Sequence, residues 1–366
     1  MQQKKALVKF APKGEDSFYD TVRQRVEDYF KTNNISKYAN RAMMLKTIVM
    51  ISLYFVPYLA VVTGLVATPL WLFYGAWILM GLGIVGIGTS VMHDSNHGSY
   101  SNKQYINGFL GSLLNILGGY SRNWRIQHNI LHHTYTNLDG LDEDIEAGVL
   151  LRMSPHKPRH NFHRFQHVYA WFLYMLMNLF WVTVKDFRQL GRYDKEGLLK
   201  KEKVTLRQAV LELSLLKVIY VAYIIVLPLM FSGVAWYHVV LGFVGMHMMA
   251  GLGLACIFQP AHVMETSTYP EPTPARKVED TWAVHQVLNT TNFAPDSSVT
   301  AWFIGGLNYQ IEHHLFPQIC HIHYPKIAPI VEKTAQEFNI PYNVQKTFAH
   351  ALLEHRRMLK ILGRTS

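Results

Sequence analysis

The sequence predicts an all-α integral membrane protein with four transmembrane helices in two hairpins, interfacial helices and a histidine-rich cytoplasmic cap. Of its 366 residues, 49% are hydrophobic and only 16% are charged, whereas soluble domains carry about 25% charged residues. Four apolar runs are about as long as the roughly 20 residues that cross a bilayer core. The chain also contains 19 histidines, and many of them gather in three short clusters.

An extramembrane arm, residues 1–44, precedes the first apolar run and contains a surface helix predicted over Asp16–Lys31. The arm is rich in Lys and Arg, which accumulate on the cytoplasmic side of membrane proteins. The first run, 47–67, and the second run, 70–90, are joined by a short turn without charge. We therefore expect a hairpin of two spans whose turn lies outside and whose ends lie in the cytoplasm.

Two further apolar segments are short for a span. Residues 106–119 include two asparagines and predict an interfacial or re-entrant helix. Residues 168–184 are only just long enough to cross a bilayer, and many basic residues follow them at 185–203. These basic residues favour an interfacial position for 168–184, because a crossing would place them outside.

The second hairpin is predicted from the runs 211–231 and 235–258, whose connecting turn carries no charge. With 168–184 in the interface, both chain ends and all three histidine clusters share the cytoplasmic side. A membrane domain is thus expected over 45–342, followed by a cytoplasmic helix or tail over 343–366. The net charge of +10 is attributed to basic cytoplasmic loops rather than to nucleic-acid binding.

The three histidine clusters have the composition of a metal site. Their sequences are H-D-S-N-H at His93–His97, H-N-I-L-H-H at His128–His133 and Q-I-E-H-H at Gln310–His314. Histidines four residues apart share one face of a helix, so each of the first two clusters can present a pair to one site. Imidazole nitrogen is a common ligand of iron, zinc and copper.

Adjacent histidines occur twice, at His132–His133 and at His313–His314. Such pairs predict two metal ions side by side, each binding one member of a pair. Because the chain has only two cysteines, histidine is the expected ligand type. The cluster residues expected to bind metal are His93, His97, His128, His132, His133, His313 and His314.

Three aspartates lie close in sequence to the first two clusters, namely Asp94, Asp142 and Asp144. Metal-binding imidazoles usually donate their second N–H to a carboxylate or carbonyl, which fixes the ring orientation. We expect these aspartates to accept such hydrogen bonds, with metal ligation as a further role. The alternative is that they cap helices or solvate a loop.

The three motifs, at these intervals, resemble those of the membrane fatty acid desaturase family. The resemblance extends from about Ile48 to about Tyr342 and includes the order of the spans. Glutamine at the start of the third motif, Gln310, is similar to the front-end branch, which includes delta-5-like, delta-6-like and linoleoyl-CoA-desaturase-like enzymes. Enzymes of this branch introduce a double bond between an existing one and the carboxyl end.

The resemblance implies a non-haem di-iron centre ligated mainly by histidine. It adds His262, in the motif Q-P-A-H, as a further ligand, and it leaves Gln310 as either a weak ligand or a neighbour that supports one. Phe258 stands where some family members have an asparagine that holds a water on one iron. His285 matches no ligand of the family.

Four other histidines fall near helical spacing among basic residues. They are expected to form a basic interfacial face that meets lipid headgroups or carrier phosphates rather than a metal site. These residues are His156, His160, His163 and His167.

The expected reaction uses O2 and two electrons to insert a cis double bond into an acyl chain carried by coenzyme A or by a lipid. Two alternatives remain at this point. One is a membrane di-iron hydroxylase or ketolase that acts on a lipid. The other is a non-enzymatic metal transporter, which predicts ligands midway along the spans rather than at their ends.

Electrons are expected from a separate protein, because no H-P-G-G haem motif indicates a fused cytochrome b5 domain. A basic cytoplasmic face favours an acidic donor of the ferredoxin or cytochrome b5 type. The other expected partners are the acyl substrate and the lipid bilayer. We expect the protein in a bacterial inner membrane rather than in the endoplasmic reticulum, with its active site on the cytoplasmic face.

Overall fold

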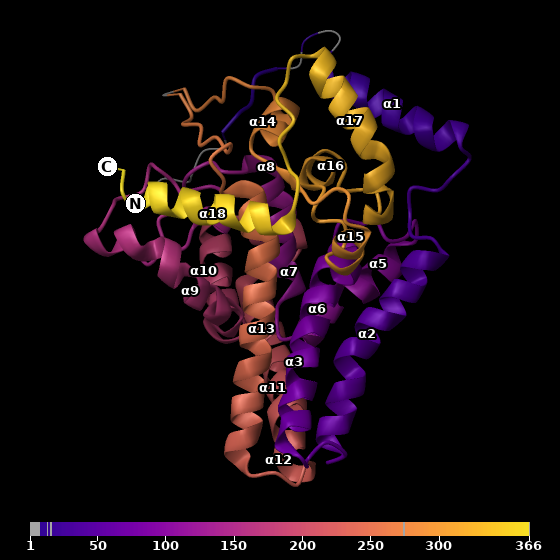
Figure 1. Ribbon diagram of the computed structural model, residues 1–366, viewed down its shortest axis with the longest axis vertical. Helices are drawn as coiled ribbons and strands as arrows, with labels where there is room; N and C mark the ends of the chain where they lie inside the picture. Colours follow the sequence, from indigo (N-terminus) through magenta and orange to yellow (C-terminus); the bar gives the residue numbers. More distant parts are fainter. Residues whose placement is uncertain (1–7, 13, 15–16, 274, 366) are drawn as a thin grey trace.

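The computed structural model describes residues 8–12, 14, 17–273 and 275–365 (Figure 1). Almost all of its regular structure is helical. Two strands, β1 (Asn292–Phe293) and β2 (Val344–Gln345), form one short parallel pair. Tall helical hairpins make up one half of the molecule, and the remaining elements form a cap at the end opposite their turns (Figure 1).

The first hairpin joins a long helix to a second helix that continues without a break into the first histidine cluster. Its elements are α2 (Arg41–Val62), α3 (Leu70–Gly86), the π-helical segment η1 (Ile87–Val91) and α4 (Met92–Asn96). The side chain of Asn40 caps α2 by accepting from the backbone N–H of Met43 at 3.1 Å. At Gly83 the two helices pack so closely that a Cβ atom would lie 2.8 Å from the backbone nitrogen of Tyr54.

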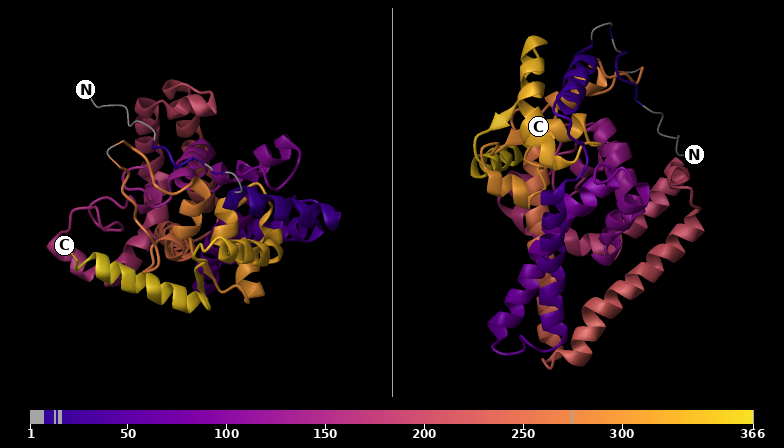
Figure 2. Two further views of the ribbon diagram at one scale, coloured as in Figure 1. Left: turned by 90° about the horizontal axis from the view of Figure 1, so that it is seen from above. Right: turned by 90° about the vertical axis from the view of Figure 1, so that its right-hand side faces the viewer.

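The second hairpin contains the longest helix of the described chain. Its elements are α11 (Leu206–Val221), η7 (Ala222–Val226), α12 (Leu227–Phe231) and α13 (Trp236–His262). Helix α13 packs against α3, where a Cβ atom on Gly81 would lie 2.6 Å from the carbonyl oxygen of Met246. Helix α11 is inclined to the other spans, as the right-hand view of Figure 2 shows.

The described chain contains five helical stretches long and apolar enough to cross a membrane. Four of them coincide with the predicted spans, which confirms an all-α membrane protein. Their outer faces carry large exposed apolar side chains, and only 17% of the apolar window in Leu206–Phe231 is buried. Apolar surface on this scale is stable only when lipid covers it.

The fifth stretch, Asn161–Glu196, includes the segment that we expect in the interface. It consists of η4 (Asn161–Phe165), α9 (Gln166–Phe180), η5 (Trp181–Lys185) and α10 (Asp186–Glu196). The rings of His132 and His262 lie 4.6 Å apart, although this stretch and the second hairpin separate them in sequence. Because the hairpin supplies two crossings, a third would put the rings on opposite sides. We infer that Asn161–Glu196 lies along the membrane surface.

The segment predicted as one interfacial helix over 106–119 forms two shorter helices, neither of which can span. The elements from here to the second histidine cluster are α5 (Gln104–Gly111), α6 (Leu113–Ile116), α7 (Ser121–Trp124), the π-helical η2 (Arg125–His132) and α8 (His133–Tyr135). Tyr105 and Phe109 are exposed on the outside of α5, whereas Leu110 is buried.

The cap contains the N-terminal helix α1 (Phe18–Thr32), which confirms the predicted surface helix. Its buried face, Phe18, Val22 and Val26, packs against α17 (Tyr324–Glu337). Helix α18 (Phe348–Leu362) lies across one edge of the molecule when it is seen from above (Figure 2). The other short elements are η3 (Glu143–Ile145), η6 (Leu198–Glu202), α14 (Trp282–Leu288), α15 (Ser298–Phe303), α16 (Gln310–Leu315) and η8 (His321–His323).

Candidate metal centre

Four separate parts of the chain bring eight histidines into one cluster where the spans meet the cap. These parts are α4, the η2–α8 segment, the last turn of α13 and α16. All of the eight are buried except His97, which is half-buried. They are the eight histidines that the sequence and the family resemblance predict as ligands: His93, His97, His128, His132, His133, His262, His313 and His314.

The eight histidines fall into two groups with one residue between them. The first histidine group is His93, His97, His128 and His313, and the second histidine group is His132, His262 and His314. Within each group the potential ligand atoms lie within 4.8 Å of one another. His133 lies between the groups: its Nε2 is 3.0 Å from Nε2 of His313, and its ring stacks on His314 at 4.4 Å.

The π-helical turn at η2 divides the second sequence cluster between the two groups. In an α-helix His128 and His132 would share a face, which was the basis of the prediction. Residues 125–132 form i to i+5 hydrogen bonds, yet the rings of His128 and His132 still stack at 5.3 Å, and their ligand atoms lie within 4.8 Å of each other and of Asp144. His128 also meets His133, five residues on, with 3.1 Å between their Nε2 atoms. Adjacent His313 and His314 divide between the groups as predicted.

In the second histidine group, each ring donates one N–H outward. Nδ1 of His132 donates to Asp142 at 3.1 Å, Nδ1 of His262 donates to the carbonyl of Asn289 at 3.2 Å, and Nδ1 of His314 donates to Oε1 of Gln286 at 2.7 Å. Nε2 of His262 and Nε2 of His314 are buried and have no hydrogen-bond partner in the described chain. Lone pairs on such inward nitrogens are what a metal ion requires.

The first histidine group and His133 also contain buried ring nitrogens without a hydrogen-bond partner. Nε2 of His97 and Nδ1 of His133 are buried without a partner among the described residues. Burial, assisted by neighbouring histidines, lowers the pKa of His97, His128 and His313 well below its usual value, so these rings are neutral. Neutral imidazole is the form that binds metal, and an unpartnered buried nitrogen is otherwise costly. The residues present therefore fit metal ions.

Asp142 supports His132 as the sequence predicts. Burial opposes protonation of His132, but the charges of Asp142 and Asp144 outweigh it and raise the pKa of the ring to about 9. A bound cation would replace that proton. The carboxylate of Asp142 also accepts from the backbone N–H groups of Asn137 and Asp144, both at 2.9 Å, which holds it in place.

Asp94 supports a different histidine from those predicted. On the short helix α4, His93 and His97 face the cluster, and Asp94 points about 100° away from His93. Its carboxylate accepts from Nδ1 of His321 at 2.8 Å, and Nε2 of His321 lies 2.8 Å from the ammonium of Lys46. Asp94 therefore connects the first cluster to the start of α2 and to η8.

Asp144 lies 3.4 Å from Nδ1 of His132 and accepts from Nε2 of Gln127 at 2.6 Å. The amide of Gln310 donates to the carbonyl of Leu307 at 2.8 Å. His285 is outside both histidine groups, and its Nε2 donates to the carbonyl of Thr136 at 2.8 Å. Burial lowers the pKa of His285 to about 4.

The basic histidine segment of the cap forms no metal group within the described chain. His156 pairs with Glu271 at 2.7 Å, and Nε2 of His163 donates to the carbonyl of Val149 at 2.8 Å. His160 is exposed and His167 is half-buried. The role of this segment as a basic interfacial face stays a prediction.

Three further contacts of the centre were not predicted, those of Gln286, Asn289 and Tyr324. The hydroxyl of Tyr324 lies 3.3 Å from Nδ1 of His313. Gln286 lies in α14 and contacts His314 through its side chain, whereas Asn289 directly follows α14 and contacts His262 through its backbone carbonyl. Nothing in the sequence connects these two residues to histidines more than twenty residues away, so only the fold identifies these contacts.

Comparison with known proteins identifies related sequences. The sequence profile of the fatty acid desaturase family matches residues 69–346. The acyl-lipid (8-3)-desaturase of Physcomitrium patens is 37% identical over 99% of this chain and 75% of its own length. The sn-1 linoleoyl-lipid 6-desaturase of Arthrospira platensis is 35% identical over 94% of this chain and 92% of its own length. The enzyme of the same name from Synechocystis sp. is 34% identical over 98% of this chain and 98% of its own length. The chain belongs to the fatty acid desaturase family and is a membrane-embedded oxidoreductase.

Proposed function

We propose that this protein is a front-end acyl-lipid desaturase whose buried histidines hold two non-haem iron ions. The observation that carries the proposal is the convergence of three distant histidine clusters into two adjacent groups with unpartnered inward nitrogens. The relatives are named acyl-lipid and linoleoyl-lipid desaturases, which supports a lipid-linked acyl chain as the substrate.

The first histidine group would hold one iron and the second histidine group the other, with His133 available to either. Bound iron would supply the activation of O2 and the removal of hydrogen from an unactivated C–H bond. Iron is favoured over zinc because desaturation is a redox reaction and zinc has no redox chemistry. In this arrangement Asp142, Gln286 and Asn289 keep the rings of the second group oriented.

An apolar wall borders the first histidine group and would keep water from the reacting carbons. The indole of Trp124 stacks on His128 at 4.5 Å, and the ring of Phe258 lies 6.4 Å from that of His93. Phe258 occupies the position where some relatives carry a polar residue, so it adds no ligand. An acyl chain that reaches the centre would lie against these side chains, which exclude water and add no ligand atom of their own.

The active site would face the cytoplasm of a bacterial cell from the inner membrane. Support comes from the basic residues of the arm and of the segment after α9, which lie on the same side as the histidine cluster in the inferred topology. The position of the ligands at span ends argues against a metal transporter, which needs sites midway across the bilayer.

A separate acidic protein of the ferredoxin or cytochrome b5 type would deliver electrons to the outer face of α18. Arg356 and Lys360 of α18, and Arg364 just after it, are exposed without an ion-pair partner among the described residues. Behind them, Nδ1 of His355 donates to the carbonyl of Val263 at 2.9 Å, and Val263 directly follows His262 in the chain. Electron transfer from a purified donor should therefore slow as salt rises; a rate that is constant from low to high ionic strength would contradict this proposal.

The reaction itself is tested by expressing the chain in a host that lacks polyunsaturated fatty acids and supplying linoleate. Mass spectrometry should find a new double bond on the carboxyl side of the existing one in the lipid fraction. His132→Ala should abolish the product, and His350→Ala, at an exposed position of α18, should retain it. A hydroxylated chain would identify a hydroxylase instead, and a product retained by His132→Ala would overturn the site.

A further inference from the structure

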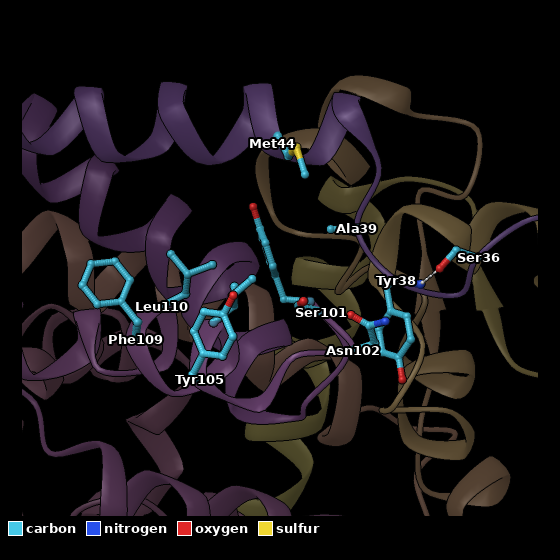
Figure 3. Close-up of a pocket in the computed structure, with 11 residues that line it drawn as sticks. Ser36, Tyr38, Ala39, Met44, Ser101, Asn102, Tyr105, Phe109 and Leu110 are labelled. Carbon is cyan, nitrogen blue, oxygen red and sulfur yellow. Dashed lines mark hydrogen bonds between the residues drawn. The ribbon is translucent and has the colours of Figure 1, made fainter.

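A cavity of about 500 Å³ lies between the start of α2 and α5, away from the histidine groups (Figure 3). This volume is within the range of roughly 300–1,000 Å³ that small-ligand sites occupy. Its walls come from the loop before α2, the first turn of α2, the loop after the first histidine cluster and the length of α5.

The outer rim of this cavity is a lipid-facing surface. On α2, Met44 lines the cavity, and Leu45 and Ile48 beside it are exposed by 63% and 62%. On α5, Tyr105 and Phe109 line the cavity and are each exposed by 71%. Since α2 is a span, these side chains contact acyl chains and the headgroup boundary of the bilayer. The cavity therefore opens sideways into the membrane at the level where the spans meet the cap.

The lining changes from polar at one end to apolar at the other. Figure 3 shows Ser36, Ser101 and Asn102 at one end, and Phe109 and Leu110 at the other. A ligand that matches this gradient has a hydrogen-bonding end and a hydrocarbon part. None of the lining residues carries a formal charge at neutral pH, so the site offers nothing to balance a phosphate-rich carrier.

The hydroxyl groups of the two serines at the polar end can each donate a hydrogen bond to a ligand. Oγ of Ser36 accepts from the backbone N–H of Tyr38 at 3.2 Å, and Oγ of Ser101 accepts from that of Lys103 at 3.1 Å. Neither hydroxyl donates to an acceptor within the described chain, so each retains its own proton for a ligand. An ester carbonyl accepts such bonds and donates none, which makes an ester the matching group.

The inner wall of the cavity leads toward the metal centre. Tyr100, three residues after His97, is buried and held by a 2.9 Å hydrogen bond to Thr47. Leu110 belongs to one hydrophobic cluster with Leu113, Leu114, Leu117 and Trp124. Trp124 in turn stacks on His128 of the first histidine group. Apolar side chains thus continue from the cavity to the place where a C–H bond would react.

We propose that this cavity binds the ester-bearing glycerol end of an uncharged membrane glycerolipid, whose acyl chain enters sideways between α2 and α5. A substrate that stays anchored in the bilayer needs such a lateral opening, whereas a water-soluble acyl carrier does not. The inference rests on the proposed function, because it assigns to this cavity the glycerol end of the same substrate, which is remote from the reacting carbons.

The test is photolabelling of the full chain in phosphatidylcholine vesicles that contain a diacylglycerol with a diazirine next to its ester. Peptide mapping should place the label within 36–44 and 100–110. Excess unlabelled diacylglycerol should suppress labelling at least about 5-fold, and the same concentration of acyl-CoA should not. Labels confined to other segments, or equal suppression by acyl-CoA, would overturn the inference.

Matched arginine variants sharpen this test. Asn102→Arg fills the polar end of the cavity and should reduce labelling at least about 5-fold. Gln104→Arg adds the same charge two residues away, outside the lining, and should label as the unaltered chain does. Equal labelling of the two variants would contradict the assignment. If Asn102→Arg does not fold, a Ser36→Ala, Ser101→Ala double variant replaces it, with labelling expected to fall about 2- to 10-fold from the loss of two hydrogen bonds.

Measuring both labelling and desaturation distinguishes a failure of the proposed function from a failure of the cavity assignment. A labelled cavity in a chain that makes no desaturated product would count against the proposed function and leave the cavity assignment intact. Desaturated product from a chain that is labelled only elsewhere would overturn the cavity assignment and leave the function intact.

Discussion

At the scale of single residues, the centre depends on groups that hold the imidazoles as well as on the imidazoles themselves. Asp142 receives the N–H of His132 and is itself held by two backbone donors. A carboxylate in this position both fixes the tautomer of the ring and increases its basicity. Loss of the charge should therefore weaken metal binding without removing a ligand.

Asp142→Asn is expected to reduce the affinity of the second histidine group for iron about 10- to 100-fold. The amide oxygen can still accept from His132 and from the backbone N–H of Asp144, whereas the NH2 group replaces the oxygen that accepts from the N–H of Asn137, so the variant loses the charge and one acceptor. The measurement is the iron content of the purified chain at increasing concentrations of a chelator. Asp139→Asn is the control, because Asp139 pairs with Lys157 at 3.2 Å outside both histidine groups. Equal iron retention by the two variants would refute this role of Asp142.

Seven of the candidate ligands were predictable from local spacing and His262 only from the family resemblance, whereas most of the supporting contacts were not predictable. Asp142 is ten residues from His132, and proximity in sequence alone suggested the pair. Gln286 and Asn289 reach the centre only because α14 packs against α16. No periodicity within α14 encodes that contact, so the sequence could not single these residues out.

At the scale of elements, α18 is attached to the membrane domain by close backbone contacts. A Cβ atom on Gly363 would lie 2.1 Å from the carbonyl oxygen of His163. Arg152 strengthens this attachment, since its guanidinium donates to the carbonyls of Leu362 and Thr365 at the end of the helix. Cations are favoured at this end of a helix.

Gly363→Ala should loosen α18, because the backbone of residue 163 must move to admit the methyl group. Overpacking of this kind costs about 1–3 kcal/mol. Faster hydrogen exchange in α18 than in the unaltered chain would show the loosening. The control is Gly191→Ala in α10, where nothing lies within 4 Å of the new Cβ and a helix gains stability from alanine. Identical exchange in both variants would argue against a close contact.

His355 should make the attachment of α18 sensitive to acid. Burial lowers the pKa of this ring to about 4, despite its bond to the carbonyl of Val263, from about 6.5 in an unfolded chain. The unfolded chain therefore binds more protons between these values, and stability falls as pH drops from 6.5 toward 4. The loss is about 2 kcal/mol between pH 7 and pH 5.

His355→Gln tests this directly, since glutamine can donate to the same carbonyl but does not titrate. Limited proteolysis should release α18 from the unaltered chain faster at pH 5 than at pH 7. In the variant, the two rates should lie closer together. The same acid sensitivity in both chains would assign it to other groups.

Elements differed from the sequence prediction mainly where the helical period changes. The length of the apolar runs located all four spans, since a run of about twenty apolar residues indicates a transmembrane helix. The π-helical turn of η2 could not be foreseen, because nothing in the residues 125–132 distinguishes a π-helical turn from an α-helical one. In the proposed centre, that turn brings His128 against His133.

At the scale of the whole molecule, the position of Asn161–Glu196 decides the topology. Its length and composition alone would permit a crossing, and only the meeting of His132 with His262 excludes it. A crossing would separate the histidine groups across the bilayer and leave neither with enough ligands. The chain therefore requires an even number of crossings between these two residues.

Single cysteines test the topology in sealed vesicles with a reagent that cannot cross the membrane. Lys31→Cys in α1 and Lys201→Cys after α10 are exposed positions and should react from the same side. Leu65→Cys, exposed by 78% in the turn of the first hairpin, should react only from the opposite side. The unaltered chain, whose Cys320 is buried and whose Cys256 is half-buried, gives the background. If Lys201→Cys reacted from the side of Leu65→Cys, Asn161–Glu196 would cross the membrane, and the two histidine groups could not form one centre.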